Sequence, residues 1–170
     1  MGETRVAAVV LGITPRQPPE VLAAALGLAS RSGGVVVCAY VDAGSYVVEE
    51  HADGSVDARP IDPDQFDWTS DTFDPDLARR VRAAGATQGV EVQLRALAGD
   101  VGKALARLAE TVDAEAIVVG SRRGGVRASM HDFFGGSVAV HLIHRQPRPV
   151  LVVPVEPSPP GMSLPWEEVS

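Results

Sequence analysis

Two glycine-containing stretches carry residue types that bind phosphate. Residues 120–125 read Gly-Ser-Arg-Arg-Gly-Gly, and Gly136 and Ser137 open a segment with helical periodicity. Glycine-rich turns and helix starts present free backbone N–H groups, and arginine adds charge, so both stretches favour an anion. The alternative is that the glycines only form tight loops and Ser137 only caps a helix. The predicted phosphate-binding residues are Gly120, Ser121, Arg122, Arg123, Gly124, Gly136 and Ser137.

Other reactive side chains do not form a recognisable catalytic or metal site. His131 and Asp132 are adjacent in a loop, which is not a chelating spacing, and no third ligand is evident. His141 and His144 have a spacing compatible with a metal, but packing or a surface hydrogen bond is the favoured role. Cys38 lies inside an apolar strand and is interpreted as an inert core thiol. The sequence offers no nucleophile with a base and no paired carboxylates, so we predict neither a metal nor an enzyme.

Length and composition limit the classes of protein to which the chain can belong. It has 170 residues, is 45% hydrophobic and 22% charged, and carries a formal net charge of −7. The length and composition are typical of one globular domain, and the negative net charge disfavours nucleic-acid binding. The one cysteine excludes an internal disulfide, and the longest apolar run, residues 21–29, is too short to cross a bilayer. We therefore expect a cytoplasmic protein without membrane contact.

Apolar and amphipathic segments alternate along the chain. Continuous apolar runs rich in valine are typical of strands buried on both faces, and each is followed by a segment with helical spacing. This order predicts a five-stranded parallel, doubly wound α/β sheet of Rossmann type with helices on both faces, because parallel neighbours need crossovers. The expected strands are 5–12, 35–41, 90–97, 116–120 and 149–155, and the expected helices are 18–30, 75–84, 101–112 and 136–144.

One acidic segment interrupts this alternation. Residues 43–74 contain nine acids and a single base, Arg59, and no clear periodicity. A structureless connection of this length is uncommon in a compact domain and is typical of a solvated loop, a lid or an interaction segment. Four aromatic residues favour partial order. The segment is a candidate surface for a basic protein partner, within a domain spanning 1–155 that is followed by an irregular proline-rich tail, 156–170.

The C-terminal motifs resemble the universal stress protein family. They are residues 116–122 (Ala-Ile-Val-Val-Gly-Ser-Arg), 134–144 (Phe-Gly-Gly-Ser-Val-Ala-Val-His-Leu-Ile-His) and 147–154 (Pro-Arg-Pro-Val-Leu-Val-Val-Pro). The resemblance covers about 135 residues, with the acidic segment as an insertion. It implies a five-stranded parallel α/β fold like that of the adenine nucleotide alpha hydrolases and a role in stress adaptation. It also implies a homodimer formed through the last strand, here Val150, Leu151, Val152 and Val153.

A subset of this family binds ATP or AMP, with Mg²⁺ expected only beside ATP. The resemblance then places Ile13, Thr14 and Val41 beside ribose and base. Two features depart from the subset's pattern of Gly, two residues, Gly, nine residues and Gly-Ser or Gly-Thr. Arg123 replaces the second glycine and the loop is about three residues longer. Thr14 also replaces the usual aspartate after the first strand. The alternative is a dimeric interaction module without a nucleotide, and acids folded over the cleft would favour it by repelling phosphate.

Overall fold

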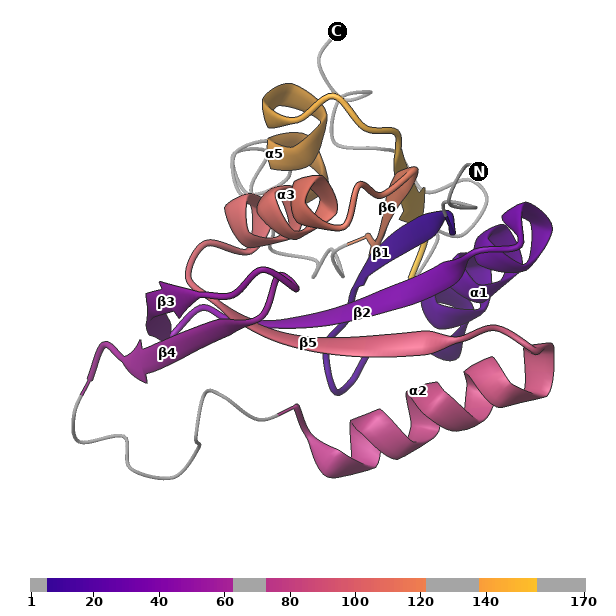
Figure 1. Ribbon diagram of the computed structural model, residues 1–170, viewed down its shortest axis with the longest axis horizontal. Coiled ribbons are helices and arrows are strands. Elements are labelled where there is room, and N and C mark those ends of the chain that lie inside the picture. The colour runs from indigo at the N-terminus through magenta and orange to yellow at the C-terminus, as the bar shows by residue number, and fades with distance from the viewer. Residues whose placement is uncertain (1–5, 63–72, 122–137, 156–170) are drawn as a thin grey trace, which may run out of the picture.

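The structure is a computed structural model that describes residues 6–62, 73–121 and 138–155. Its centre is a five-stranded sheet in which every pairing is parallel, in the order β5-β2-β1-β6-β7 (Figure 1). This confirms the predicted fold class. The strands are β1 (Ala8–Gly12), β2 (Val35–Asp42), β5 (Val92–Ala98), β6 (Ala116–Gly120) and β7 (Val150–Val153).

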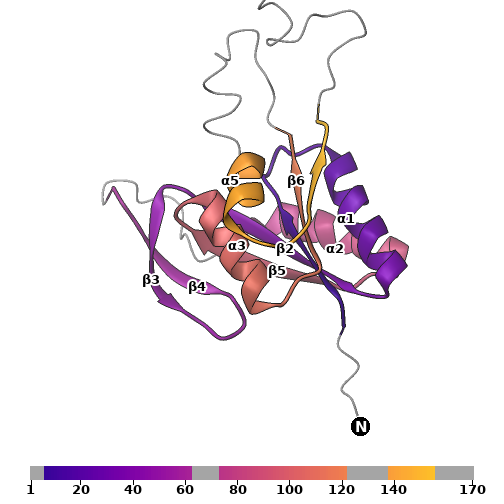
Figure 2. The same cartoon turned by 90° about the horizontal axis from the view of Figure 1, so that it is seen from above.

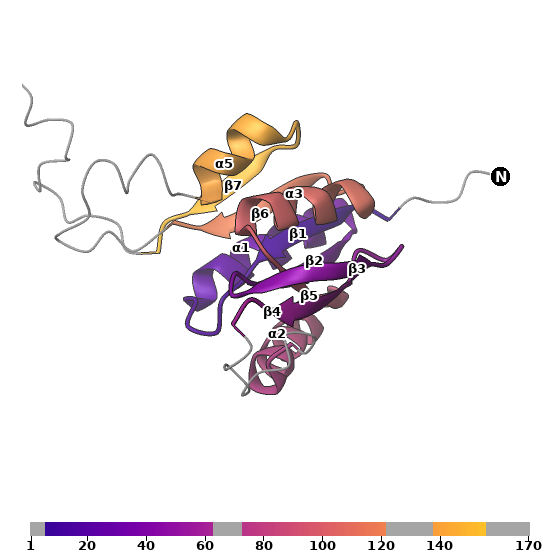
Figure 3. The same ribbon diagram turned by 90° about the vertical axis from the view of Figure 1, so that its left-hand side faces the viewer.

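Helices cover both faces of this sheet. Helices α1 (Pro19–Ser32) and α2 (Pro75–Gln88) pack on one face, and α3 (Val101–Thr111) and α5 (Val138–Arg145) pack on the other (Figures 2 and 3). The side chains of β1 show the two layers. Val9 and Leu11 belong to the core under α1, whereas Val10 belongs to the core under α3. Successive side chains of a strand point to opposite faces, so a continuous apolar run suits this buried position.

Local signals define several helix ends. The Asp100 carboxylate accepts a hydrogen bond from the backbone N–H of Lys103 at 2.8 Å and so caps the N-terminus of α3. Helices α1 and α2 continue to residues 32 and 88, beyond their predicted ends. They end at Gly33 and Gly89, which adopt the left-handed conformation that glycine tolerates best.

The expectation that 43–74 has no regular structure is wrong for its first half. Strands β3 (Ser45–Glu50) and β4 (Val56–Pro60) form an antiparallel hairpin. Asp53 and Gly54 form the turn: the Asp53 carboxylate accepts from the N–H and hydroxyl of Ser55, and Gly54 has a φ of +82°. Valines in both arms and an Asp-Gly turn are a hairpin signal that the high charge obscured. Residues 63–72 and the tail 156–170 lie outside the described residues.

The Cys38 thiol is fully buried in β2. Burial in an apolar environment disfavours the thiolate and raises the pKa of this thiol to about 12. We expect the native protein not to react with a thiol reagent at pH 8, whereas protein unfolded in guanidinium reacts with one equivalent. Rapid labelling of the native state, followed by absorbance, would contradict the buried position.

Candidate functional site

A pocket of about 480 Å³ opens where the chain order of the strands reverses. Strand β1 is followed by β2 on one side, and its other neighbour is β6, so the loops leaving β1 and β6 diverge and leave a crevice. Five of the predicted nucleotide-binding residues line this pocket: Ile13, Thr14, Val41, Gly120 and Ser121. The structure therefore brings together three segments that are far apart in the sequence.

The remaining predicted site residues lie outside the described residues. They are Arg122, Arg123, Gly124, Gly136 and Ser137, and the adjacent pair His131 and Asp132 also lies there. Their part in the site stays a prediction. The described chain leaves β6 at Ser121 and resumes at Val138, and both of these residues line the pocket. The two ends of the predicted phosphate-binding loop therefore lie at the same pocket.

Two glycines allow the pocket walls to approach the strand ends. A Cβ atom on Gly12 would lie 2.8 Å from Cδ1 of Leu105, and one on Gly120 would lie 3.0 Å from Nε2 of Gln17. Real Cβ contacts are rarely this short, so a side chain at either glycine would displace a neighbour. Glycine at these two strand ends therefore allows Leu105 and Gln17 to pack closely against the backbone around the pocket.

The pocket has one apolar wall and one polar wall. The apolar wall consists of Val101 and Leu105 of α3 with Val138 and Ala139 of α5. The polar wall is the loop from Thr14 to Pro18, including Arg16 and Gln17, which connects β1 to α1. Sequence reasoning missed these residues, although the loop after a strand beside the reversal point is where such folds bind ligands. The four-residue spacing of Val101 and Leu105 was a second available signal.

Ser121 joins the ends of β6 and β7 as well as lining the pocket. Its backbone N–H donates to the Val153 carbonyl at 2.8 Å, and its hydroxyl oxygen accepts from the Val155 N–H at 2.9 Å. A hydroxyl that accepts one hydrogen bond still has its own hydrogen to donate. Ser121 is therefore held in place by β7 and keeps a donor for a ligand.

The electrostatic character of the pocket suits an anion. Among its described lining residues, Arg16 is the only charged side chain and none is a carboxylate. Val101 and Leu105 of α3 face the pocket. The acidic hairpin lies against other residues of α3, and the Glu50 carboxylate pairs there with Arg107 at 2.8 Å. The hairpin's acids are therefore not folded over this cleft, and the expected repulsion does not arise from them.

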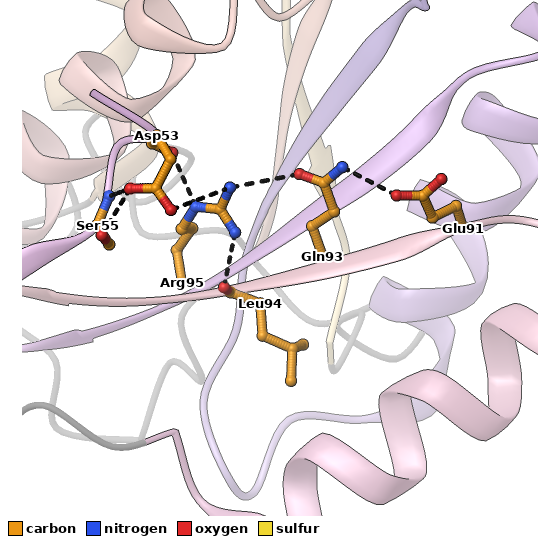
Figure 4. A network of polar contacts seen from close by, with 6 residues as sticks. All are labelled: Asp53, Ser55, Glu91, Gln93, Leu94 and Arg95. Atoms are coloured by element: carbon orange, nitrogen blue, oxygen red, sulfur yellow. Dashed lines mark hydrogen bonds and ion pairs between the residues drawn. The ribbon is translucent and has the colours of Figure 1, made fainter. Parts of the chain in front are cut away.

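Asp53 and Asp57 of the hairpin also contact other residues of the chain. Figure 4 shows Arg95 of β5 with its Nε donating to the Asp53 carbonyl at 2.8 Å and its guanidinium 3.7 Å from the Asp53 carboxylate. Hydrogen bonds from Ser55 are the main reason that the pKa of Asp53 is lowered. His51 lies 3.2 Å from Asp57, and this hydrogen bond raises the pKa of the imidazole. The predicted basic partner of the acidic segment stays a prediction.

A metal site is not found among the described residues. They contain no group of three or more histidine, cysteine, aspartate or glutamate side chains that could hold an ion. His141 packs against α3 instead, since a Cβ on Gly102 would lie 2.7 Å from its ring. Within the same part of the chain, no helix has the length and apolar character needed to cross a membrane.

Comparisons with known proteins agree with this fold. The model of the Universal stress protein family matches residues 7–154. Among solved structures, a universal stress protein in complex with cAMP is 20% identical with a TM-score of 0.59, over 90% of this chain and 100% of that one. The universal stress protein from Archaeoglobus fulgidus in complex with dAMP is 19% identical with a TM-score of 0.53, over 88% and 99%.

A third solved structure is a universal stress protein family protein from Arabidopsis thaliana with AMP bound. It is 13% identical with a TM-score of 0.54, over 88% of this chain and 92% of that one. At these identities the likeness shows the fold alone. A comparison with curated protein sequences gives no match.

Proposed function

Because this chain belongs to the universal stress protein family, we propose that it binds an adenine nucleotide, AMP or ATP, in the pocket between β1 and β6. We also propose that the protein acts in a cytoplasmic stress response and catalyses no reaction itself. The observation that carries this proposal is a pocket of about 480 Å³ with an apolar wall, a polar wall and no carboxylate among its described lining residues. Three solved proteins of similar fold hold cAMP, dAMP or AMP.

The pocket offers separate surfaces for the base and for the sugar and phosphates of a nucleotide. Its volume lies within the range of about 300–1,000 Å³ that is usual for small-molecule sites. The aliphatic side chains of α3 offer an apolar surface for the base, and Val41 lies near the end of the neighbouring strand β2. Thr14, Gln17 and Ser121 offer polar groups for the sugar and phosphates. The predicted loop residues Arg122, Arg123, Gly124, Gly136 and Ser137 would complete the phosphate side.

Titration with AMP and with ATP, with and without Mg²⁺, tests the proposal. A ligand at 100 times its dissociation constant adds about 2.7 kcal/mol to the free energy of unfolding. For a domain of this size that corresponds to a rise in Tm of about 5–10 °C. Calorimetry should give one site per chain. No heat and no change in Tm at millimolar AMP or ATP would overturn the proposal.

We further propose that the protein is a homodimer formed through β7. This edge strand pairs only with β6 among the described strands, and 42% of Leu151 and 40% of Val152 are exposed. Exposed apolar edge strands are prone to pair with another chain. Light scattering at micromolar concentration should give twice the chain mass, and Leu151→Lys should give the monomer mass. A monomeric mass for the unmodified protein would refute the dimer.

A further inference from the structure

The loop between β1 and α1 presents two side chains whose donor groups have no described partner. We propose that Arg16 and Gln17 form an anion subsite that takes the phosphate group of the ligand. This inference rests on the proposed nucleotide function and assigns one end of that ligand to one wall of the pocket. Both residues line the pocket, and no described residue on that wall carries a negative charge.

The amide of Gln17 has a defined orientation. Its Oε1 accepts a hydrogen bond from the Thr14 N–H at 2.9 Å, and the oxygen is the only acceptor in an amide side chain. The NH₂ end must therefore point away from this bond, and its Nε2 lies over Gly120 at the carboxyl end of β6. No described residue accepts a hydrogen bond from Nε2. The structure thus holds a neutral donor at the pocket, beside the start of the predicted phosphate-binding loop.

Arg16 supplies the charge of this subsite. Its side chain is exposed at the pocket and forms no ion pair or hydrogen bond with a described residue. The loop of residues 13–18 contains no acid, because Thr14 stands where the family resemblance leads one to expect an aspartate. A phosphate at this wall would therefore meet a guanidinium without a competing carboxylate, and charge-assisted hydrogen bonds to phosphate are the stronger kind.

The loop is fixed before any ligand binds. The Ile13 N–H donates to the Ala39 carbonyl at 2.9 Å, and the Gln17 N–H donates to the Thr14 carbonyl at 3.1 Å. From α2, the Arg80 guanidinium donates to the Pro15 carbonyl at 3.0 Å. Three separate contacts thus hold the backbone that carries Arg16 and Gln17. A preformed subsite spends less free energy on ordering when the anion binds.

A comparison of AMP with adenosine isolates the phosphate contribution. We expect Arg16→Ala to weaken AMP binding about tenfold and to leave adenosine binding unchanged, because only AMP carries the anion. Arg31→Ala removes the same charge from the last turn of α1, away from the pocket, and is the matched control. Equal losses for AMP and adenosine, or equal losses in both variants, would refute the subsite.

Gln17→Glu tests the neutral donor. The introduced carboxylate can still accept the Thr14 N–H, so the loop keeps its turn, but a negative charge replaces the NH₂ group. We expect AMP to bind at least about tenfold more weakly than to the unmodified protein, and adenosine to be affected less. Gln88→Glu, at the exposed end of α2, adds the same charge elsewhere. Unchanged AMP affinity in Gln17→Glu would contradict the assignment.

An NMR titration separates failure of this inference from failure of the proposed function. Inorganic pyrophosphate added to ¹⁵N-labelled protein should shift the side-chain NH₂ resonance of Gln17, and Arg16→Ala should abolish that shift. If AMP does not bind but pyrophosphate gives this result, the subsite holds and the nucleotide function falls. If AMP binds and neither variant changes its affinity, the subsite falls and the function stands. If neither AMP nor pyrophosphate has an effect, both are wrong.

Discussion

Gly34→Ala is expected to lower the free energy of unfolding by about 3–4 kcal/mol. Gly34 connects α1 to β2, and a Cβ atom built on it would overlap the carbonyl oxygen of Ala7. The same oxygen accepts a hydrogen bond from the Val35 N–H at 2.8 Å, so it cannot move without breaking the contact between β1 and β2. Because the obstacle is backbone rather than a flexible side chain, relaxation is costly. Urea denaturation followed by circular dichroism measures the loss.

Gly33→Ala is the matched control for this prediction. Gly33 has a φ of +66°, and a Cβ there would meet nothing within 4 Å. An alanine at this position has only the strain of the left-handed conformation, about 1–2 kcal/mol. The two neighbouring glycines therefore separate the cost of backbone conformation from the cost of overlap. If Gly34→Ala lowered the free energy of unfolding no more than Gly33→Ala does, the close packing described between β1 and the start of β2 would be contradicted.

Val41→Trp is expected to weaken AMP binding by about 100-fold or more. Val41 is half-buried near the end of β2 and lines the pocket. An indole there would occupy space that the proposed function assigns to the base, and aromatic residues are well tolerated in strands. A 100-fold loss corresponds to about 2.7 kcal/mol of binding free energy. Calorimetric titration of the variant with AMP measures it.

Val48→Trp provides the corresponding control. Val48 lies in β3, is 54% exposed, and is not among the residues that line the pocket. The same substitution there should leave AMP affinity unchanged, which separates steric blocking from a general effect of adding tryptophan. Circular dichroism and Tm should show that both variants fold. Retention of full AMP affinity by a folded Val41→Trp protein would place the nucleotide outside this pocket.

The parts of the site found from sequence were those with a local signal or a match to the family pattern. Gly120 ends a short apolar strand and Ser121 follows it directly, whereas Thr14 and Val41 came from the family resemblance. Gln17 has no comparable signal, because a glutamine before two prolines is typical of any loop. Its role depends on the oxygen that it turns toward Thr14 and on its position over Gly120. The second of these contacts joins residues that are more than 100 positions apart.

For Gln17 the sequence offered no signal, whereas it led to a wrong prediction for the β3–β4 hairpin. Its high charge predicted a segment without structure, because acids repel one another when only their number along the chain is known. In the fold, Glu50 contacts Arg107 and Asp53 contacts Arg95, so cations from α3 and β5 compensate these two acids. Those arginines lie about 40 to 60 positions further along the chain. The sequence pattern carries no information that they approach the hairpin.

The sequence by itself determined the fold class and most element positions. Buried parallel strands need continuous apolar runs, amphipathic helices need a period near 3.6, and both patterns depend on residues close in the chain. Only the tertiary structure decided which strands are neighbours, and therefore that Gly12, Gln17 and Gly120 share one pocket. The glycine- and arginine-rich stretch first indicated an anion site after β6. The fold adds a second wall, the Arg16–Gln17 loop, because β1 and β6 lie side by side at the point where the chain order reverses.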